Sequence, residues 1–584
     1  MSNPPGKDIF MKEGIDMTLK KKRKKKKASK MALRSTLEIP LILVLANNFL
    51  NQLGFVDFIN SSVTWDEKQW KVSPGNLAKA IILATFSKVR APLSRIKNAF
   101  EMIDTETLFG KGVLPEYLND DALARALDRI GEENLESLFS TFALSMYIKF
   151  TIPMNRLHSD TTSISFYGDY EQCEDDEDGL QIVRGYNKDH KPECKQVVVG
   201  KIVNEHGLAI VNSTMNGNTS DIEWNQKALG LIKNLLGEKL NDTIYIADSK
   251  LINLPTLNIL RDVNRPIQFI SRCPDNFYKK VANKMITKAY VEDKWQEIGQ
   301  VSNTKKASIY STQEFTTDVE GKDLRFIVVK TSAGKLRAER EVLKQRKTLE
   351  EGITKLSKKT FVCEADAEEE WVRFQKEFKK NIHLSHREFE KTETPKRPRG
   401  NPGKNPLPPV IETTWKVLVT IDGLDAERLK QLEQGKECFV LITSVPENKL
   451  DQEQVLRQYK AQTVVEVQFH LLKQPALASV IFLKTPRRID ALVMLLNVSL
   501  LIRGLMQYKI RKSMQESQKE LPRIGPNKGK LKSPTTNYLI EELGKSVLIR
   551  DVSGRYTYLF SNEYCALCAT TFFQLLGVDM DDPF

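Results

Sequence analysis

Apolar residues recur every three or four positions through the first quarter of the chain, which is the spacing of a helix with one buried face. Prolines punctuate this pattern and divide it into separate helices. The predicted helices cover residues 37–53, 75–87, 91–102, 120–131 and 135–147. We therefore expect an all-helical domain over residues 32–153.

The pattern then changes to short runs of β-branched and aromatic residues, which predict strands. Ser220 with Glu223 three positions later forms a capping-box pattern, so a helix should begin there and run to residue 236. The order β-β-β-α-β-α-β is typical of an RNase H-like mixed sheet, and the predicted fold class is α/β with that core. The predicted strands are residues 163–167, 195–203, 208–214, 243–247 and 267–271.

Beyond residue 274 the pattern leaves this core. Further strands are expected at 307–315, 324–330, 415–421 and 438–444, a charged helical stretch at 336–389, and helices at 456–472 and 487–514. The predicted domains are a disordered basic arm (1–31), the helical domain for DNA-end binding and dimerisation (32–153), the first part of the core (154–274), a large, partly β insertion (275–436), the second part of the core (437–515) and a C-terminal region (516–584).

The composition fits a globular protein, because 41% of the 584 residues are hydrophobic and 28% are charged. The formal charge is +13, but residues 1–34 hold twelve Lys/Arg against three Asp/Glu, a net +9 that leaves only +4 for the rest. A basic arm of this kind favours nucleic acid, because each Lys or Arg near a phosphate releases counterions. A tail that only aids solubility is the other interpretation.

Seven scattered cysteines indicate free thiols in a reducing compartment. Cys565 and Cys568 form a lone C-x-x-C with no second pair nearby, so we interpret them as packing residues and not as a zinc site. The apolar runs at 39–50 and 491–506 contain polar residues and fit neither a signal peptide nor a membrane-spanning helix. These features predict a cytoplasmic protein with no membrane partner.

Two acidic residues are expected at the ends of strands. Asp160 lies where the helical domain gives way to the first strand, and Asp248 closes the strand at 243–247. Carboxylates at adjacent strand ends can share a divalent cation, because Mg²⁺ prefers hard oxygen ligands. Taken singly, either residue fits the ordinary role of a cap or turn residue. His158 is interpreted as a hydrogen-bond donor behind Asp160 or as a packed histidine.

A third acidic residue lies on the predicted helix at 456–472. At about 100° per residue, its polar residues Tyr459, Gln462, Glu466 and Lys473 fall within an arc of roughly 60°. One face thus carries an acid, a base, a phenol and an amide between apolar flanks. An amphipathic helix with a charge pair seven residues apart is the alternative.

These segments together resemble the DDE insertion-sequence transposases of the IS-four type, whose third acid lies in a Tyr-x₂-Arg-x₃-Glu-x₆-Lys signature. Tyr459, Glu466 and Lys473 match at the family's spacing, and Gln462 stands in the place of the Arg. The context of Asp160 (HSDTTS) and the segments GYNKDHKP (185–192) and GNTSD (217–221) resemble the same branch. The long interval before Glu466 suits a core split by a large insertion.

The resemblance implies a DNA transposase that excises an insertion sequence and inserts it elsewhere. Asp160, Asp248 and Glu466 would hold two Mg²⁺ ions, for which Mn²⁺ can substitute, and the chemistry would be phosphoryl transfer without a covalent enzyme intermediate. Tyr459, Gln462 and Lys473 would contact phosphates of the transposon end. The implied partners are double-stranded DNA, as terminal inverted repeats and as target, and a second copy of the chain in a synaptic homodimer at the nucleoid.

Two further basic segments are candidate DNA contacts. Lys396, Arg397 and Arg399 lie in PKRPRGNP, which resembles a minor-groove hook, although Asn401 replaces its second Arg and a plain linker is the alternative. The other segment is the Pro- and Gly-rich loop at 519–535.

Three other functions remain open at this point. A retired transposase would bind DNA without cutting it, and Gln462 favours that interpretation while the intact triad opposes it. An RNase H-like nuclease would cleave without joining strands. A basic RNA- or ribosome-associated protein would depend on residues 1–30.

Overall fold

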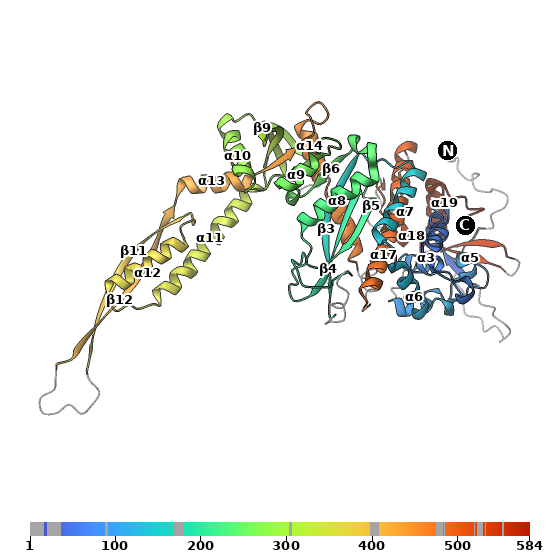
Figure 1. The fold of residues 1–584 in the computed structure, drawn as a ribbon, viewed down its shortest axis with the longest axis horizontal. Helices are drawn as coiled ribbons and strands as arrows, with labels where there is room; N and C mark the ends of the chain where they lie inside the picture. Colours follow the sequence, from blue (N-terminus) through green and yellow to red (C-terminus); the bar gives the residue numbers. More distant parts are fainter. Residues whose placement is uncertain are drawn as a thin grey trace, which may run out of the picture. The chain divides into compact units, whose positions relative to one another are not determined.

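The computed structural model describes residues 17–19, 37–87, 92–168, 170, 179–302, 307–397, 408–474, 483, 485–518, 520–522, 530–531, 533–551 and 554–584 (Figure 1). The chain forms two compact units. The first contains residues 1–269 and 461–584, and the second contains residues 270–460. The first unit is therefore built from both ends of the chain, whereas the pattern-based division set the inserted segment at 275–436.

The N-terminal part of the first unit is helical, as predicted. The helix expected at 91–102 is shorter, because residues 93–95 form a single 3₁₀ turn before it, and α2 follows α1 after a bend at Gly54 that the sequence pattern did not predict. The helices are α1 (Leu41–Gln52), α2 (Phe55–Ser62), α3 (Pro74–Ala84), α4 (Ile96–Phe100), α5 (Thr105–Phe109), α6 (Asp120–Gly131) and α7 (Leu135–Lys149).

A long helix from the other end of the chain completes this core. α17 (Pro486–Ser517) packs against α6, α7 and β5, together with α18 (Thr536–Leu543) and α19 (Glu563–Leu576). Its most apolar stretch has a mean hydropathy of 1.8, enough to cross a membrane by length and composition, but 94% of that stretch is buried inside the protein. Burial of this kind is also found in the core helices of globular domains.

The sheet strands of the first unit follow one another in the order β5-β4-β3-β6. β3 pairs antiparallel with β4 and parallel with β6, so the sheet is mixed. Along the chain the order is β3, β4, β5, α8, β6, α9, β7, which confirms the predicted element order. These elements are β3 (Arg156–Phe166), β4 (Lys195–Asn204), β5 (Ala209–Met215), α8 (Asp221–Leu236), β6 (Ile244–Ala247) and α9 (Leu254–Leu260).

Local sequence explains where α8 begins. The Ser220 side chain accepts a hydrogen bond from the Glu223 amide, and the Glu223 carboxylate accepts one from the Ser220 amide. Two amides at the helix start are thereby satisfied by the predicted capping box. Trp224, in the first turn, donates a hydrogen bond to the Ser159 hydroxyl and fixes α8 against β3.

The first strand begins earlier than predicted. β3 starts at Arg156 and not at residue 163, so Asp160 lies inside the strand and not before it. The segment RLHSDTTS reads as a loop because it is polar, yet β4 and β6 pair with it on both sides and satisfy its backbone groups.

The sheet strands of the second unit follow one another in the order β7-β13-β10-β9-β8. The helical stretch predicted to reach residue 389 ends earlier, because residues from His383 onward form one strand of a long antiparallel ribbon. Its elements are β7 (Gln268–Arg272), which begins at the division, α10 (Val281–Glu292), β8 (Gln296–Gln300), β9 (Ile309–Val319), β10 (Lys322–Thr331), α11 (Gly334–Ser357), α12 (Glu364–Glu377), β11 (His383–Lys396), β12 (Val410–Leu424), α13 (Ala426–Glu437), β13 (Cys438–Thr443) and α14 (Gln452–Lys460).

The ribbon β11–β12 has a small core of its own with α11 and α12. Trp371 of α12 is 2% exposed and stacks on Phe374, and Val417 of the ribbon is fully buried against the same cluster. Apolar residues at alternate ribbon positions, such as Phe389 and Trp415, face these helices because strand side chains alternate in direction.

A second, small sheet joins the two ends of the chain in the order β1-β17-β16-β2. Within the arm expected to be disordered, residues 17–19 pair with β17 as a strand. The rest of residues 1–31, and most of the loop at 519–535, lie outside the described residues. The strands are β1 (Met17–Leu19), β2 (Glu38–Pro40), β16 (Val547–Arg550) and β17 (Tyr556–Phe560), and β14 (Leu521–Pro522) pairs separately with β15 (Lys530–Leu531).

Candidate functional site

Two neighbouring parallel strands bring Asp160 and Asp248 level with each other. His158 of β3 is the register partner of Ile246 of β6. Asp160 lies two residues after His158, and Asp248 lies two residues after Ile246. Because adjacent strands are roughly 4.8 Å apart and side chains repeat every two residues, the two carboxylates lie on the same side of the sheet, at the point where β6 ends.

A lysine and a third aspartate complete an acidic cluster, which we define as Asp160, Asp221, Asp248 and Lys188. The Lys188 ammonium lies 3.4 Å from an Asp160 oxygen and 3.1 Å from an Asp221 oxygen. It also donates to the Thr161 hydroxyl at 2.7 Å and to the Thr161 carbonyl at 3.0 Å. The Thr161 hydroxyl in turn donates to Asp221 at 2.5 Å.

Electrostatics in the cluster follow from burial and from charge. Burial, with repulsion from Asp160 and Asp221, raises the pKa of Asp248 to about 6. Burial also raises the pKa of Asp160, although Lys188 and the Thr161 amide act against it. For Lys188, burial alone would lower the pKa, but attraction to Asp160, Asp221 and Asp248 outweighs it, and the pKa is raised.

Each aspartate also has a local role. The Asp248 carboxylate accepts a hydrogen bond from the Lys250 amide and caps a short 3₁₀ turn, which is the ordinary role that the sequence left open. The Asp160 carboxylate accepts from the Thr161 amide at 2.7 Å. Both acids remain partly exposed, so capping does not close them off from a ligand.

The predicted helix at 456–472 is broken into two. α14 ends at Lys460, and α15 (Thr463–Leu472) begins after a turn at residues 461–462. The arc calculated for one continuous helix is therefore wrong for Tyr459, which lies before the break and packs its ring 6.4 Å from Phe439 in the second unit. β-branched Thr463 and Val464 at the start of α15 weaken the helix at this point.

Gln462 and Glu466 lie on the first-unit side of the break. The Gln462 side-chain amide points at the Ser159 carbonyl of β3, at 3.5 Å, so the start of α15 is next to the strand that carries Asp160. Glu466, one turn later, is exposed. Among the described residues, no group of three His, Cys, Asp or Glu side chains is arranged to hold a metal ion. The structure thus brings Asp160 and Asp248 together and does not show Glu466 joined to them.

The donor set nevertheless has the chemistry that a hard divalent cation requires. Asp160, Asp221 and Asp248 offer carboxylate oxygens within one charge cluster, and a cation, Lys188, is already stabilised among them. Mg²⁺ binds through one or two carboxylates and keeps water or phosphate oxygens at its other positions. The residues therefore fit Mg²⁺ better than they fit a soft metal.

Lys473 has a carboxylate partner. It follows α15 and donates to both oxygens of Asp189, at 2.6 and 2.8 Å. Asp189 is the direct neighbour of Lys188 in the chain. The segment GYNKDHKP resembles the family branch, but no local pattern assigns a role to Lys188 or Asp189. Both residues lie far in sequence from their partners, and only the fold brings them together.

Two buried basic side chains lie close to Asp160, one on β3 itself and one on the neighbouring strand β4. His158 is fully buried, neither ring nitrogen has a hydrogen-bond partner among the described residues, and burial lowers its pKa to about 4. Lys201, the cross-strand partner of Asp160 on β4, is also fully buried, and burial lowers its pKa to about 7. Its ammonium lies 5.5 Å from the centre of the Phe469 ring of α15.

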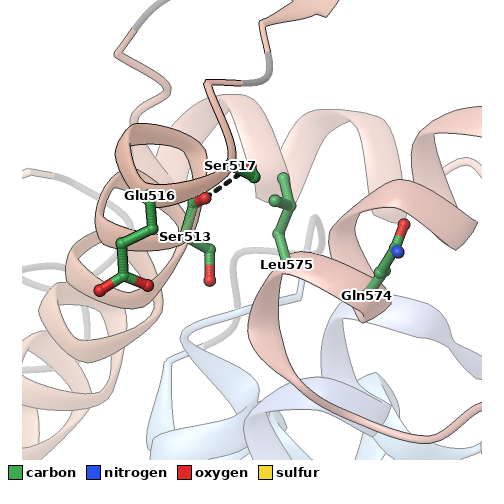
Figure 2. Close-up of a pocket in the computed structure, with 5 residues that line it drawn as sticks. All are labelled: Ser513, Glu516, Ser517, Gln574 and Leu575. Atoms are coloured by element: carbon green, nitrogen blue, oxygen red, sulfur yellow. Dashed lines mark hydrogen bonds between the residues drawn. The ribbon is translucent and has the colours of Figure 1, made fainter.

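The other candidate residues lie elsewhere in the fold. Lys396 ends β11 and pairs with Glu412 across the ribbon, Arg397 is exposed just beyond it, and Arg399 is outside the described residues. Cys565 and Cys568 are buried on α19. A pocket of about 340 Å³ between the ends of α17 and α19 is lined by Ser513, Glu516, Ser517, Gln574 and Leu575 (Figure 2). None of these lining residues belongs to the acidic cluster.

Comparisons with known proteins add little to this geometry. Residues 38–144 match a family model described as a domain of unknown function (DUF4277), which covers N-terminal helices and none of the acidic cluster. A comparison with curated protein sequences finds no match. Among solved structures, the chain is similar to the piggyBac transposase in its synaptic complex with hairpin DNA, at 9% identity over 87% of this chain and 79% of that chain, with a TM-score of 0.36. A likeness at this level carries no argument about fold or activity.

Proposed function

We propose that this chain is a DNA transposase of the DDE type, with an RNase H-like core, in the IS-four branch of insertion-sequence enzymes. The observation that carries the proposal is the placement of Asp160 and Asp248 at equivalent positions of two adjacent parallel strands. Their carboxylates share a charge cluster at the end of β6, beside the start of α15, the helix whose sequence resembles the family's third-acid signature. Its substrate would be double-stranded DNA with terminal inverted repeats, bound by a homodimer in the cytoplasm.

Each residue then has a chemical role. Asp160 and Asp248 supply the oxygen ligands for Mg²⁺, which in this chemistry activates the attacking oxygen and stabilises the leaving one. Glu466 is the proposed third ligand, and it joins the other two when α15 shifts on binding DNA. Lys473 is proposed to position a phosphate of the transposon end without reading its sequence. Tyr459, which lies in the second unit, is proposed as a separate phosphate contact from the family signature alone. Gln462, which here points at the Ser159 carbonyl, takes the place of an arginine that would neutralise a phosphate.

One observation favours a second function. Glu466 is exposed and is not joined to the aspartates, and Gln462 departs from the family signature. A retired transposase that binds DNA and no longer cuts it would carry this combination. The two functions differ in whether the aspartates are needed for a chemical product.

The experiment is Mg²⁺-dependent cleavage and joining of DNA that carries the inverted repeats flanking the gene, with purified full-length protein. Asp160→Asn and Asp248→Asn should each abolish both products, because an amide cannot replace the negative charge of a metal ligand. The matched control is Asp57→Asn, an exposed aspartate of α2. It should leave both products unchanged.

The outcomes separate the candidate functions. Cleavage followed by joining, lost in both cluster variants, supports the transposase. Cleavage without joined products points to an RNase H-like nuclease. Binding of repeat DNA without any cleavage points to the retired protein. Binding that depends on residues 1–30 and prefers RNA would point to the basic RNA-associated alternative.

A further inference from the structure

The ammonium group of Lys188 lies where a cation is needed among the acidic residues. It contacts Asp160 at 3.4 Å and Asp221 at 3.1 Å, and Asp248 also attracts it. Its remaining donors go to the hydroxyl and carbonyl of Thr161. Three carboxylates this close would repel one another without a cation, so Lys188 stabilises the cluster in the chain on its own.

Asp189, the next residue, places a negative charge beside a lysine. Asp189 accepts two hydrogen bonds from Lys473, the lysine that we propose for a DNA phosphate. A carboxylate with two oxygens at this distance satisfies a lysine ammonium as phosphate oxygens would. Lys188 and Asp189 thus place a positive charge in the proposed metal site and a negative charge in the proposed phosphate site.

A buried asparagine holds these two residues in one turn. The Asn187 side chain donates to Ser165 and to Gln196, both at 2.8 Å, and accepts from the Asp189 amide at 2.9 Å. The Lys188 amide also points at the Ser163 hydroxyl of β3, at 3.4 Å. The backbone of the turn is therefore anchored to the sheet, and the long Lys188 side chain can leave the cluster without movement of that backbone.

We propose that the Lys188–Asp189 pair is an internal substitute for the metal and the DNA phosphate, which must be displaced before the site is loaded. This inference rests on the proposed function and adds a step to it. A divalent cation displaces Lys188 from the carboxylates, and a phosphate displaces Asp189 from Lys473.

The displacement of Lys188 by a divalent cation is tested with Mn²⁺ as the probe, using full-length protein without DNA. Lys188→Met should bind Mn²⁺ about tenfold more tightly than the wild type, measured by electron paramagnetic resonance of free Mn²⁺, because it removes the competing charge. Lys191→Met is the matched control, since it removes the same charge from the same loop outside the cluster. It should bind Mn²⁺ as the wild type does.

A second measurement needs no variant. Acetylation of the wild-type protein, read by mass spectrometry, reports whether the Lys188 amine is accessible. Lys188 should be protected without metal and become reactive when Mn²⁺ saturates the site, while Lys191 should react equally in both states. Lys188 that stays protected at saturating Mn²⁺ would overturn the inference.

The displacement of Asp189 from Lys473 by a DNA phosphate is tested by measuring binding of a short DNA duplex of mixed sequence at low salt. Asp189→Asn should tighten binding about two- to fivefold, the range expected for releasing a partly exposed ion pair. The gain should vanish in the Lys473→Met background. Glu193→Gln, which removes an exposed acid of the same loop, is the control for a general change in charge. A gain of equal size in Glu193→Gln, or one that persists without Lys473, would contradict the inference.

Failure of this step and failure of the proposed function give different results. Mn²⁺ bound in the wild type but lost in Asp160→Asn, with Lys188 still protected, rejects the internal substitute and leaves the metal site intact. Mn²⁺ binding that does not depend on Asp160 rejects both. Tighter Mn²⁺ binding in Lys188→Met together with exposed Lys188 supports both.

Discussion

Replacing Lys201 with methionine should stabilise the protein strongly at neutral pH. Lys201 is fully buried on β4 without a hydrogen-bond partner among the described residues, and burial lowers its pKa from 10.5 to about 7. At about 1.36 kcal/mol for each pKa unit, keeping this amine in the fold costs about 5 kcal/mol of unfolding free energy at low pH. Methionine has a similar length and no charge, so most of this cost should disappear, a gain of about 3–5 kcal/mol.

The lowered pKa of Lys201 also fixes the direction in which the free energy of unfolding changes with pH. Between about pH 7 and 10.5 the folded state has released a proton that the unfolded chain still holds, so the free energy of unfolding of the wild type rises with pH in this window. The advantage of Lys201→Met should be full below pH 7 and should vanish above 10.5. Urea unfolding of full-length protein at several pH values measures both, provided that the m-value is unchanged.

Lys195→Met tests whether any lysine of β4 gives the same result. Lys195 starts the strand and is partly exposed, and its replacement should change stability by less than about 0.5 kcal/mol at every pH. If Lys201→Met is no more stable than the wild type at pH 7, or if the difference does not narrow as pH rises, the reasoning from burial is refuted.

Three further predictions concern other parts of the fold. Ser220→Ala should cost about 1 kcal/mol in urea unfolding because it removes the capping box of α8, whereas Ser220→Thr should retain most of the stability. Trp371→Ala should destabilise the ribbon core of the second unit by about 3–5 kcal/mol, seen as faster hydrogen exchange of β11 and β12 amides with no change in β4. Burial raises the pKa of Asp490 on α17 to about 6, so wild-type stability should fall as pH rises from about 4 to 6; Asp490→Asn should remove that fall and gain up to about 3 kcal/mol at pH 7 in urea titrations, and an unchanged pH profile would contradict this.

Elements fixed by local chemistry were predictable from the sequence. The capping box of Ser220 and Glu223 placed the start of α8, and the run of buried β-branched residues placed β6 up to Asp248. These signals depend on a few neighbouring residues, whose preferences act in any context. The order of elements around the first sheet followed from them.

Features fixed by tertiary contacts were not predictable. The segment around Asp160 reads as a loop, and it becomes a strand only because β4 and β6 pair with it. The helix that should have aligned Tyr459 with Glu466 breaks at residues 461–462, where no proline or glycine signals a break. Periodicity cannot detect such a break, since the apolar spacing continues through it.

The acidic cluster contains residues that the sequence identified and residues that only the fold identifies. Asp160 and Asp248 were identified from their resemblance to a family and their expected strand ends, and the register brings them level. Lys188, Asp189 and Asp221 come from loops and a helix start, where charge patterns are common and carry no periodic signal. Only their contacts in the fold distinguish them from ordinary surface charges.

The division of the first unit between the two ends of the chain has a consequence for biosynthesis. On the ribosome, β3 to β6 emerge first, and residues 270–460 follow before α15 and the buried helix α17 exist. At roughly 5–20 residues per second, the parts of β3, β4 and β5 that α15 and α17 contact stay uncovered for on the order of ten to forty seconds. In this interval the nascent chain holds the two aspartates without the helix that carries Glu466. The order of synthesis thus delays the completion of the first unit, and the packing of α15 beside β3, until the last fifth of translation.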